Sequence, residues 1–304
     1  MKVVIPVAGF GTRLKPHTEK VQKTLLPVAG KKIIDHILAP LFKHNIHDIT
    51  FIIGHLGNQV VDHMKLYEGR FRFVEQKELL GLGHAILQGL EDKDEPVLVQ
   101  LGDTIFNIDY SALINSMYNK ILVAQVEDPS RFGIVELNGQ DIINFYEKDP
   151  NPPSNWAISG LYYLKSEYRL KSAIEYLIKK NIQTNNEYQL TDALKIMLND
   201  GEVFKIHPSE GYLDVGVPVD FLTANKALLK SDHGYFHNTD IIEPVFIGKN
   251  CEIQNSTIGP NVTIMDNCTI VDCHIENSIV LEKSQLNNNK INDKIVGEDG
   301  SKFC

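Results

Sequence analysis

The chain has few cysteines and no long apolar run. Four cysteines occur among 304 residues, all in the last fifth of the chain and without a CxxC pair: Cys251, Cys268, Cys273 and Cys304. Because structural zinc is held mainly by closely spaced Cys pairs, we expect no zinc site. No segment approaches the ~18 apolar residues of a transmembrane helix, and the N-terminus lacks a long apolar segment with a cleavage site. We therefore expect a cytoplasmic protein.

Basic charge is also in short supply. The 30 Lys and Arg against 39 Asp and Glu give a formal net charge of -9. This balance provides no general attraction to a phosphate backbone or an anionic membrane, so we expect neither as a partner. A polyanion would have to bind in a local cationic pocket. The other fractions, 43% hydrophobic and 23% charged residues, are typical of globular domains and exclude collagen-like or disordered chains.

Short β-branched runs alternate with helical patterns in the first part of the chain. Strands are predicted at 2–7, 48–54, 70–76, 96–103 and 120–127, with helices between them. This alternation is typical of right-handed βαβ units, and it predicts an α/β fold with a mixed, mainly parallel sheet. Shorter strands from residue 132, with helices at 167–180 and 188–199, predict an extension of the same sheet. Ligands of such sheets bind beyond the carboxyl ends of the strands.

Aliphatic residues recur every five or six positions near the C-terminus. They are Ile247, Ile253, Ile258, Ile264, Ile270, Ile275 and Val280. The spacing resembles the hexapeptide repeat of the left-handed parallel β-helix. It predicts three regions: an α/β domain over 1–239, about two coils of β-helix over 240–286, and a polar tail over 287–304.

The cysteines at 251, 268 and 273 are interpreted as compact fillers of tight turns in these coils. Cys251 and Cys268 are one coil apart, and stacking at the ~4.8 Å strand spacing would permit a disulfide. A reducing cytosol argues against that bond.

A glycine-rich loop follows the first predicted strand: Ala8-Gly9-Phe10-Gly11-Thr12-Arg13. Glycines allow backbone N–H groups to approach a phosphate closely. A dinucleotide fingerprint would need a glycine where Leu14 stands, and no GxxxxGK[ST] loop occurs. The ensemble GTRL-x-P followed by Lys23-Thr-Leu-Leu-Pro-Val resembles the sugar-1-phosphate nucleotidyltransferases, whose signature is GxGTRLxPLTxxxPKxLLPV.

Seven later stretches match the same family in the right order. They are Gln76 with GLGHA at 81–85, LGD at 101–103, RFG at 131–133, EK at 147–148, ISGLY at 158–162, EYQLTD at 187–192, and LDVG at 213–216. Departures are Ala8, Asp149 and Tyr212, where many members have Gly, Pro and Trp. None of these departures removes a charged catalytic group, and the resemblance covers residues 1 to about 229.

The resemblance implies a Rossmann-like nucleotidyltransferase fold and a complete set of site residues. The catalytic residues would be Arg13, Lys23 and Lys148, and the Mg²⁺ cofactor would be held by Asp103 and Asp214. Nucleotide binding is expected at Ala8, Gly9, Gly11, Thr12, Arg13, Lys23, Gln76, Gly81 and Asp103. Sugar-phosphate binding is expected at Gly133, Glu147, Lys148, Ile158, Gly160 and Tyr162. Tyr162 is equally compatible with core packing. Glu187 is interpreted as a helix-capping carboxylate, with support of the sugar site as the alternative.

The implied reaction joins an NTP and a sugar 1-phosphate into an NDP-sugar and pyrophosphate. A phosphate monoester is largely dianionic at neutral pH, so the nucleophile needs no general base. Catalysis then consists mostly of alignment and charge neutralisation. Gln76 and the backbone at Gly81 could read a uracil or thymine imide edge. We expect dTTP and glucose 1-phosphate; the alternatives are a UTP-glucose-1-phosphate uridylyltransferase and a catalytically silent regulatory subunit. We also expect a homo-oligomer formed through the C-terminal region.

Overall fold

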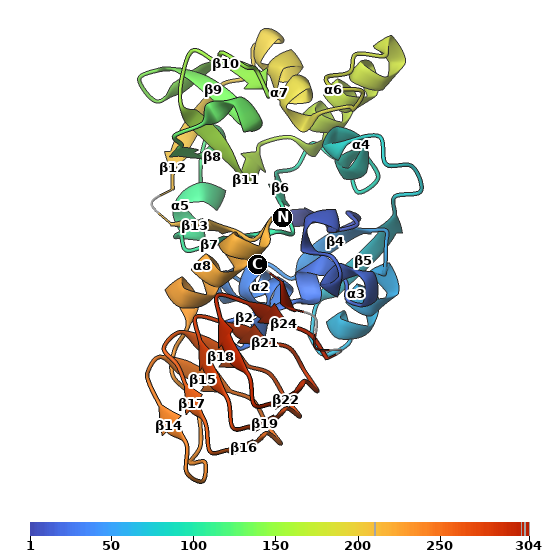
Figure 1. Cartoon of the computed structure of the whole chain (residues 1–304). Helices are drawn as coiled ribbons and strands as arrows, with labels where there is room; N and C mark the ends of the chain where they lie inside the picture. Colours follow the sequence, from blue (N-terminus) through green and yellow to red (C-terminus); the bar gives the residue numbers. More distant parts are fainter. Residues whose placement is uncertain (210, 299, 301, 304) are drawn as a thin grey trace. The chain divides into compact units, whose positions relative to one another are not determined.

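The chain forms two compact units. The computed structural model describes residues 1–209, 211–298, 300 and 302–303, so Cys304 lies outside the described residues. The first unit combines Met1–Gly9 with Ile37–Tyr212, and the second combines Phe10–His36 with the chain from Leu213 onward. This grouping cuts across the expected ranges 1–239, 240–286 and 287–304, because a segment near the N-terminus packs with the C-terminal region. Figure 1 colours the chain along the sequence.

A nine-stranded sheet is the framework of the first unit. Its order is β5 (Arg70–Glu75), β4 (Asp48–Ile53), β1 (Lys2–Pro6), β6 (Val97–Gln100), β11 (Trp156–Leu164), β8 (Asn119–Gln125), β12 (Phe204–Pro208), β10 (Asp141–Glu147) and β9 (Gly133–Asn138). The first four are parallel neighbours: Val3 lies opposite Ile49 on one side and Leu98 on the other. β11 is antiparallel to both β6 and β8. The expected mixed, Rossmann-like sheet is therefore confirmed, but it is not mainly parallel: among the described strands, four pairs are parallel and five are antiparallel, because the strands after residue 132 join it mostly antiparallel.

Helices cover this sheet where the sequence places apolar stripes. They are α2 (Ile33–Lys43), whose first turn lies in the second unit, α3 (Gly57–Met64), α4 (Leu82–Leu87), α5 (Tyr110–Ile114), α6 (Glu167–Lys180) and α7 (Leu190–Asn199). The N-cap residue of α6 is Ser166, whose hydroxyl accepts a hydrogen bond from the Arg169 N–H (3.1 Å), and its C-cap residue is Asn181, in the left-handed conformation. α6 packs against α7, and α7 against β10. In the part of the chain that the structure describes, no helix is long and apolar enough to cross a bilayer.

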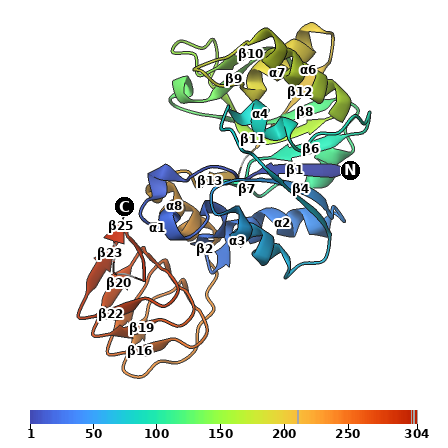
Figure 2. The same ribbon diagram turned by 90° about the vertical axis from the view of Figure 1, so that its right-hand side faces the viewer.

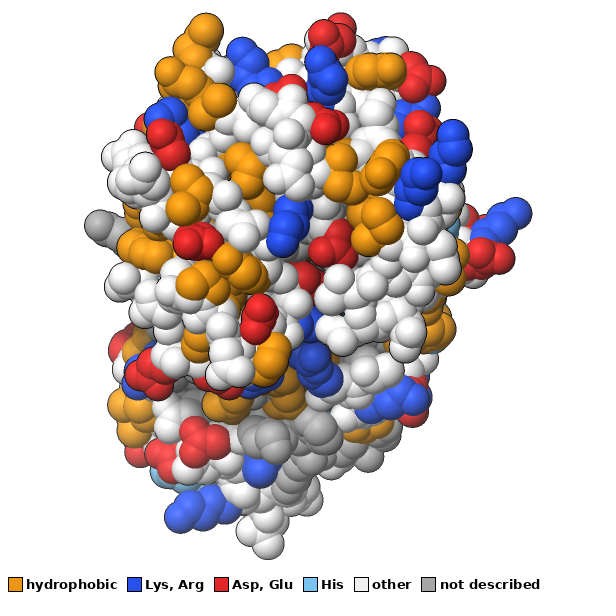
Figure 3. Space-filling view, turned by 90° about the horizontal axis from the view of Figure 1, so that it is seen from above, with side chains coloured by type: hydrophobic (Ala, Val, Ile, Leu, Met, Phe, Trp, Pro, Cys, Tyr) orange, Lys and Arg blue, Asp and Glu red, His pale blue; other side chains and the backbone are white. Residues whose placement is uncertain are grey.

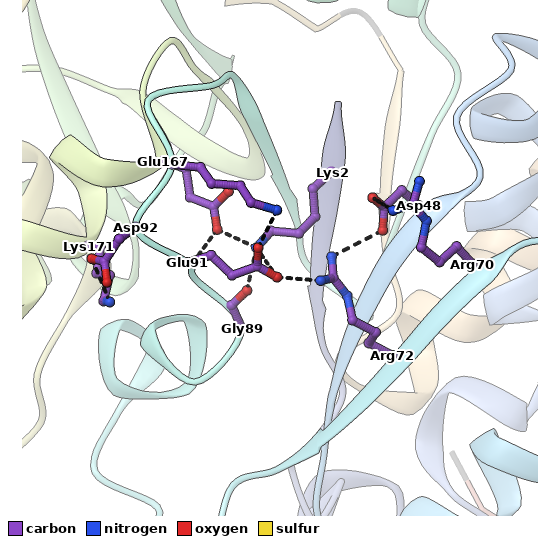
Figure 4. Close-up of polar contacts among 10 residues, drawn as sticks. Lys2, Asp48, Arg70, Arg72, Gly89, Glu91, Asp92, Glu167 and Lys171 are labelled. Carbon is purple, nitrogen blue, oxygen red and sulfur yellow. Dashed lines mark hydrogen bonds and ion pairs between the residues drawn. The ribbon is translucent and has the colours of Figure 1, made fainter.

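Ion pairs connect the amino ends of the parallel strands (Figure 4). Lys2, the first residue of β1, is 7% exposed and pairs with the carboxylate of Glu167, which is 2% exposed. The Lys2 ammonium also donates to the carbonyl of Gly89 at 2.8 Å. Arg72 pairs with Glu91 and, at 3.1 Å, with Asp48 at the start of β4. These charges lie at the opposite ends of the strands from the loops that carry the candidate site, so we assign them to stability.

The N-terminal signature segment belongs to the second unit. It consists of the short 3₁₀ helices η1 (Thr12–Leu14) and η2 (Lys23–Leu25), helix α1 (His17–Lys20) and the hairpin β2 (Pro27–Val28) with β3 (Lys31–Lys32). Helix α8 (Pro218–Leu228) packs against β2. The buried Asn225 amide of α8 accepts from the Ala29 N–H (2.9 Å) and the Thr263 hydroxyl (2.7 Å), and donates to the Asn261 carbonyl (3.2 Å). One side chain thus links the hairpin turn to the C-terminal strands.

The C-terminal region is a stack of short coils (Figure 2). Its strands are β14 (Asp240–Ile241), β15 (Val245–Ile247), β16 (Glu252–Gln254), β17 (Thr257–Ile258), β18 (Val262–Ile264), β19 (Thr269–Val271), β20 (His274–Glu276), β21 (Ile279–Val280), β22 (Gln285–Asn287), β23 (Lys290–Asn292), β24 (Ile295–Val296) and β25 (Lys302–Phe303). They form three sheets of parallel strands, in the orders β14-β17-β20-β23, β15-β18-β21-β24 and β16-β19-β22, and β25 adds antiparallel to β24. Ile258, Ile275 and Ile291 lie in register and are buried.

The coils extend past the expected range of 240–286. β23 and β24 continue two of the parallel sheets inside the segment expected to be a polar tail. Ile291, Ile295 and Val296 are buried there, while the polar residues between them occupy strand edges and corners. The corners are marked by residues at positive φ: Asn238, Asn250, Asn255, Asn261, Asn267, Asp272, Asn277, Lys283, Asn288 and Asp293. Asparagine and aspartate tolerate this conformation better than most residues, so the polar character of 287–296 reflects turns.

Candidate active site

Loops at the carboxyl ends of the parallel strands carry several of the expected residues in the first unit. Ala8 and Gly9 follow β1, Gln76 follows β5, and Asp103 follows β6. Parallel strands end at one edge of the sheet, which is the usual ligand-binding edge. Gly54, after β4, was not predicted: a Cβ there would lie 2.6 Å from the Ala8 carbonyl oxygen. Its lack of a side chain lets the loop after β1 approach β4.

The Gln76 amide lies beside Gly81, as expected. Gln76 is 7% exposed, and its Nε2 lies 3.5 Å from both the Gly81 carbonyl oxygen and the His84 Nδ1. Gly81 has φ +107°, and a Cβ there would lie 2.8 Å from the Glu187 Cβ and from the Tyr188 backbone. The Gly83 N–H donates to the Tyr188 carbonyl at 2.8 Å. Residues 187–188 therefore form one wall of this loop.

The interpretation of Glu187 as a helix cap is wrong. α7 begins at Leu190, and Gln189 is its N-cap residue. The Glu187 carboxylate accepts instead from the Gln189 side-chain amide at 2.7 Å. The sequence predicts a helix that begins at residue 188, which would make Glu187 its cap, but the helix begins two residues later.

A substitution at Gly81 tests this packing. Gly81→Ala places a methyl group against backbone and imposes an unfavourable φ, so we expect a loss of nucleotide affinity of about tenfold or more and a stability cost above ~2 kcal/mol. Gly139→Ala is the matched control: Gly139 has φ +63°, but nothing lies within 4 Å of its Cβ position. It should lose only ~1–2 kcal/mol and no nucleotide affinity. Calorimetric titration and urea unfolding measure both; equal affinities in the two variants would contradict the assignment.

Gly160 lies next to the loop that carries Asp103. It has φ +98° within β11, where the pairing with β8 shifts register, and its carbonyl accepts from the Leu101 N–H at 2.9 Å. A Cβ on Gly160 would lie 2.7 Å from Leu101 Cδ1. Glycine at this position thus allows β11 to pack closely against the β6 loop, two residues before Asp103.

The expected sugar-phosphate residues lie around Gly133. Gly133 and Glu147 are cross-strand partners in β9 and β10. A Cβ on Gly133 would lie 3.2 Å from the Glu147 carboxylate, 3.3 Å from Ile158 Cδ1 and 3.0 Å from the Thr191 hydroxyl. Lys148 follows at φ +48°; its N–H donates to the Phe132 carbonyl, and its ammonium lies 3.7 Å from the Glu147 carboxylate. Glu147 and Lys148 thus place one carboxylate and one cation beside Gly133.

Burial sets the electrostatics of these residues. It raises the pKa of Glu147, an effect opposed by a hydrogen bond from Thr191 and by the charge of Lys148. Asp192 adds to the increase, and burial also raises the pKa of Asp192 itself. Tyr162 is 4% exposed, and burial together with the Glu147 charge raises its pKa. Thr191 and Asp192 were not predicted as site residues, although their signal was present in the EYQLTD stretch.

The substitution Glu147→Gln is expected to increase stability and to decrease activity. A raised pKa means that the folded state binds the proton more tightly than the unfolded state, so the stability contributed is full below the unfolded pKa and is lost as pH rises. At neutral pH the charged Glu147 is thus destabilising. We expect Glu147→Gln to raise the thermal midpoint near pH 7 and to lower kcat/KM for the sugar phosphate by about 10- to 100-fold. Glu136→Gln, on the neighbouring strand β9, is the control; a Glu147→Gln midpoint that falls would contradict the burial argument.

The signature segment is held together by Gly11 in the second unit. Gly11 has φ +62°, and its carbonyl accepts from the Thr18 hydroxyl at 2.8 Å. A Cβ on Gly11 would lie 2.8 Å from Thr18 Cγ2 and 3.3 Å from Lys23 Cβ. The glycine therefore lets η1, with the exposed Thr12 and Arg13, fold back against the start of η2 at Lys23.

The two expected metal ligands belong to different units. Asp103 lies in the first, and Asp214, exposed at the end of β13 (Tyr212–Asp214), lies in the second. Among residues 1–209, 211–298, 300 and 302–303, no group of three or more His, Cys, Asp or Glu side chains could hold a metal ion. Mg²⁺ commonly takes one or two carboxylates plus substrate phosphates and water, so two aspartates fit its donor chemistry.

The candidate residues thus fall into two sets, and basic and acidic side chains are interspersed on the face shown in Figure 3. The first unit carries Ala8, Gly9, Gln76, Gly81, Asp103, Gly133, Glu147, Lys148, Ile158, Gly160 and Tyr162. The second carries Gly11, Thr12, Arg13, Lys23 and Asp214. Among these candidates, the cationic side chains are Lys148 in the first unit and Arg13 and Lys23 in the second.

The known proteins that this chain resembles include nucleotidyl transferases with different names. A family model described as nucleotidyl transferase matches residues 2–231. The bifunctional protein GlmU of Methanococcus aeolicus is 30% identical over 332 residues, covering 100% of this chain and 79% of its own. The glucose-1-phosphate thymidylyltransferase of Streptomyces antibioticus is 27% identical over 337 residues, covering 98% and 92%. A crystal structure assigned to a Bacillus anthracis glucose-1-phosphate thymidylyltransferase, in complex with a sucrose, has a TM-score of 0.66 at 26% identity, covering 77% and 98%.

Proposed function

The chain belongs to the nucleotidyl transferase family, and on this premise we propose that it condenses dTTP with glucose 1-phosphate to dTDP-glucose and pyrophosphate. It is a sugar-1-phosphate nucleotidyltransferase; the base and the sugar are the proposed part. The corner formed by Gly133, Glu147 and Lys148 carries the proposal, because it sets a carboxylate for sugar hydroxyls beside a cation for the phosphate. The Streptomyces thymidylyltransferase supports the choice of dTTP, since it aligns over nearly the full length of both chains.

In the proposed reaction the protein aligns two phosphates and neutralises their charge. The sugar phosphate oxygen attacks the α-phosphorus of the NTP in line, a P–O bond to it forms, and the bond to pyrophosphate breaks. Lys148 binds the sugar phosphate, Glu147 accepts hydrogen bonds from sugar hydroxyls, and Arg13 and Lys23 bind the triphosphate. Asp103 and Asp214 would hold Mg²⁺, which supplies further neutralisation of phosphate charge.

A substrate matrix tests the proposal. Five triphosphates (dTTP, UTP, GTP, CTP and ATP) are combined with the 1-phosphates of glucose, galactose, mannose and N-acetylglucosamine, and pyrophosphate release is followed by a coupled assay. We expect the largest kcat/KM for dTTP with glucose 1-phosphate. No release from any pair would overturn the enzyme function and favour a catalytically silent regulatory subunit.

UTP is the competing nucleotide. Gln76 and the Gly81 backbone would read the imide edge that uracil and thymine share, and the two bases differ by one methyl group. A methyl group in a pocket is worth ~1–3 kcal/mol, so the ratio of the two kcat/KM values should lie between about 10 and 200. A ratio in favour of UTP would identify a uridylyltransferase with the same site.

The C-terminal coils are proposed to form a left-handed parallel β-helix that mediates homo-oligomer contacts. The stacked coils bury their aliphatic residues in one internal cluster, and their parallel strands repeat along the stack. We expect light scattering of the full chain to give a mass of at least twice the 34.3 kDa of the monomer. A monomeric mass at micromolar concentration would contradict this proposal and leave the chemistry of the site unaffected.

A further inference from the structure

Cys251 and Cys268 occupy equivalent positions on adjacent coils. Glu252 pairs with Thr269 in the β16–β19 sheet, so the residues just before them stand one above the other. The Glu252 N–H donates to the Cys268 carbonyl at 2.9 Å. Ser284 takes the same position on the next coil, because Thr269 pairs with Gln285. Neighbouring strands of a sheet lie about 4.8 Å apart, within the Cα separations that disulfides span.

The two side chains also lean in the same direction. The Cys251 thiol donates to the Met265 carbonyl at 3.1 Å, and the Cys268 thiol donates to the Leu281 carbonyl at 3.2 Å. Each acceptor lies on the following coil, so the Cys251 sulfur points toward the coil that holds Cys268. Cys251 is partly exposed, whereas Cys268 is 1% exposed. The Cys251 thiol is therefore accessible to a small oxidant, whereas the Cys268 thiol is buried.

Their acidities differ in the same sense. Contact with the Cys268 thiol lowers the pKa of Cys251, although burial and the Asp266 charge oppose the change. The same contact, together with burial, raises the pKa of Cys268. A thiolate is the reactive form of cysteine, and Cys251 is also the more exposed of the two, so Cys251 is the nucleophile of the pair.

We propose that Cys251 and Cys268 are a reversible oxidation site, at which hydrogen peroxide converts the two thiols into a disulfide that links adjacent coils. The Cys251 thiolate attacks the peroxide, forming an S–O bond while the O–O bond breaks; the released hydroxide takes a proton and leaves as water. The Cys268 sulfur then attacks Cys251, an S–S bond forms, the S–O bond breaks, and a second water leaves. Two electrons pass from the thiols to the peroxide.

The bond is expected to be absent under reducing conditions, in agreement with the expectation from the sequence. The disulfide would link the residues that precede β16 and β19. It closes the loop between the two cysteines in the unfolded chain, and this constraint on the unfolded chain stabilises the folded coils. The oxidised protein should therefore unfold at a higher temperature than the reduced protein.

Peptide mapping tests the proposal. The full chain carrying Cys304→Ser is treated with hydrogen peroxide in the folded state, then unfolded in urea and blocked with N-ethylmaleimide, digested and analysed by mass spectrometry. We expect a Cys251–Cys268 linked peptide lighter by two hydrogen atoms, an alkylated Cys273, release of the link by dithiothreitol, and a raised thermal midpoint before release. Overoxidised Cys251 beside an alkylated Cys268, or equal reactivity of Cys251 and Cys273, would overturn the proposal.

Serine variants assign the two roles. Cys268→Ser should leave a sulfenic acid on Cys251 that dimedone traps, and Cys251→Ser should leave Cys268 reduced. Cys273→Ser is the matched control and should keep the link, since Ser256 and Asn289 hold the equivalent positions on the neighbouring coils. Ser284 occupies the position equivalent to Cys251 and Cys268 on the next coil, so serine is compatible with the fold there. If a serine variant fails to fold, the map of the Cys304→Ser protein alone decides between the outcomes.

Discussion

Asp103→Asn and Asp214→Asn are each expected to lower kcat by about three orders of magnitude while the chain stays folded. An amide keeps the shape of the carboxylate but lacks the charge that would hold Mg²⁺ against the phosphates. Metal ions contribute several kcal/mol of charge stabilisation in such transfers, and about 4 kcal/mol corresponds to a factor of 10³. Turnover is measured by pyrophosphate release over a range of Mg²⁺ concentrations. Near-normal turnover in either variant would refute that ligand assignment.

Asp109→Asn provides the matched control for this pair. Asp109 is exposed, lies six positions after Asp103, and caps α5 by accepting from the Ser111 N–H at 2.9 Å. Asparagine caps helices about as well as aspartate, so stability and turnover should both stay close to those of the unmodified protein. Its removal of one negative charge matches that of Asp103→Asn. A comparable loss of activity in Asp109→Asn would mean that the effect comes from net charge rather than from metal binding.

Glu167→Gln is expected to lower the free energy of unfolding by about 3 kcal/mol or more. The substitution leaves the buried Lys2 ammonium without its principal counter-charge, since Glu91 lies farther away at 3.8 Å. Removing one partner of a buried ion pair typically costs ~3–5 kcal/mol, because the other charge stays desolvated. Urea unfolding measures the change, and turnover at 25 °C should be retained.

Two further variants test the reasoning. Asp92→Asn breaks the pair with Lys171, whose partner carboxylate is largely exposed, and should cost less than ~1 kcal/mol. The double variant Lys2→Met with Glu167→Gln should recover part of the stability lost in Glu167→Gln, because no unpaired buried ammonium remains. If Lys2→Met instead lowered the stability of the Glu167→Gln protein further, as an independent substitution would, the pairing of Lys2 with Glu167 would be contradicted.

The parallel half of the sheet was predictable because its strands are short β-branched runs between helical stripes. β1, β4, β5 and β6 lie where the periodicity places them. The grouping of Gly133, Glu147 and Ile158 followed only from the family resemblance, since cross-strand register is not visible in a single sequence. Gly54 was missed for the same reason: its close approach to Ala8 depends on which strands are neighbours.

The coils extend farther than the sequence predicts because aliphatic residues become sparse after Leu286. After Leu286 the aliphatic positions Ile291 and Ile295 are still present, but asparagine, aspartate and lysine surround them. Asparagines at positive φ recur at the same corners on successive coils, as at Asn250 and Asn267, whose side chains hydrogen bond at 3.3 Å. These corner residues recur every 16 to 17 positions and continue the repeat to Asp293, as in the series Asn261, Asn277 and Asp293.

The packing of the hairpin turn on the coils has a consequence for exchanging parts between relatives. A Cβ on Gly30 would lie 2.7 Å from the Phe246 ring, and Asn225 bonds both Ala29 and Thr263. The segment that carries Arg13 and Lys23 is therefore fitted to the particular coils beneath it. A chimera that takes its C-terminal repeats from another protein would need the partners of residues 29, 30 and 225 transferred as well, so the two ends of the chain are inherited as a matched pair.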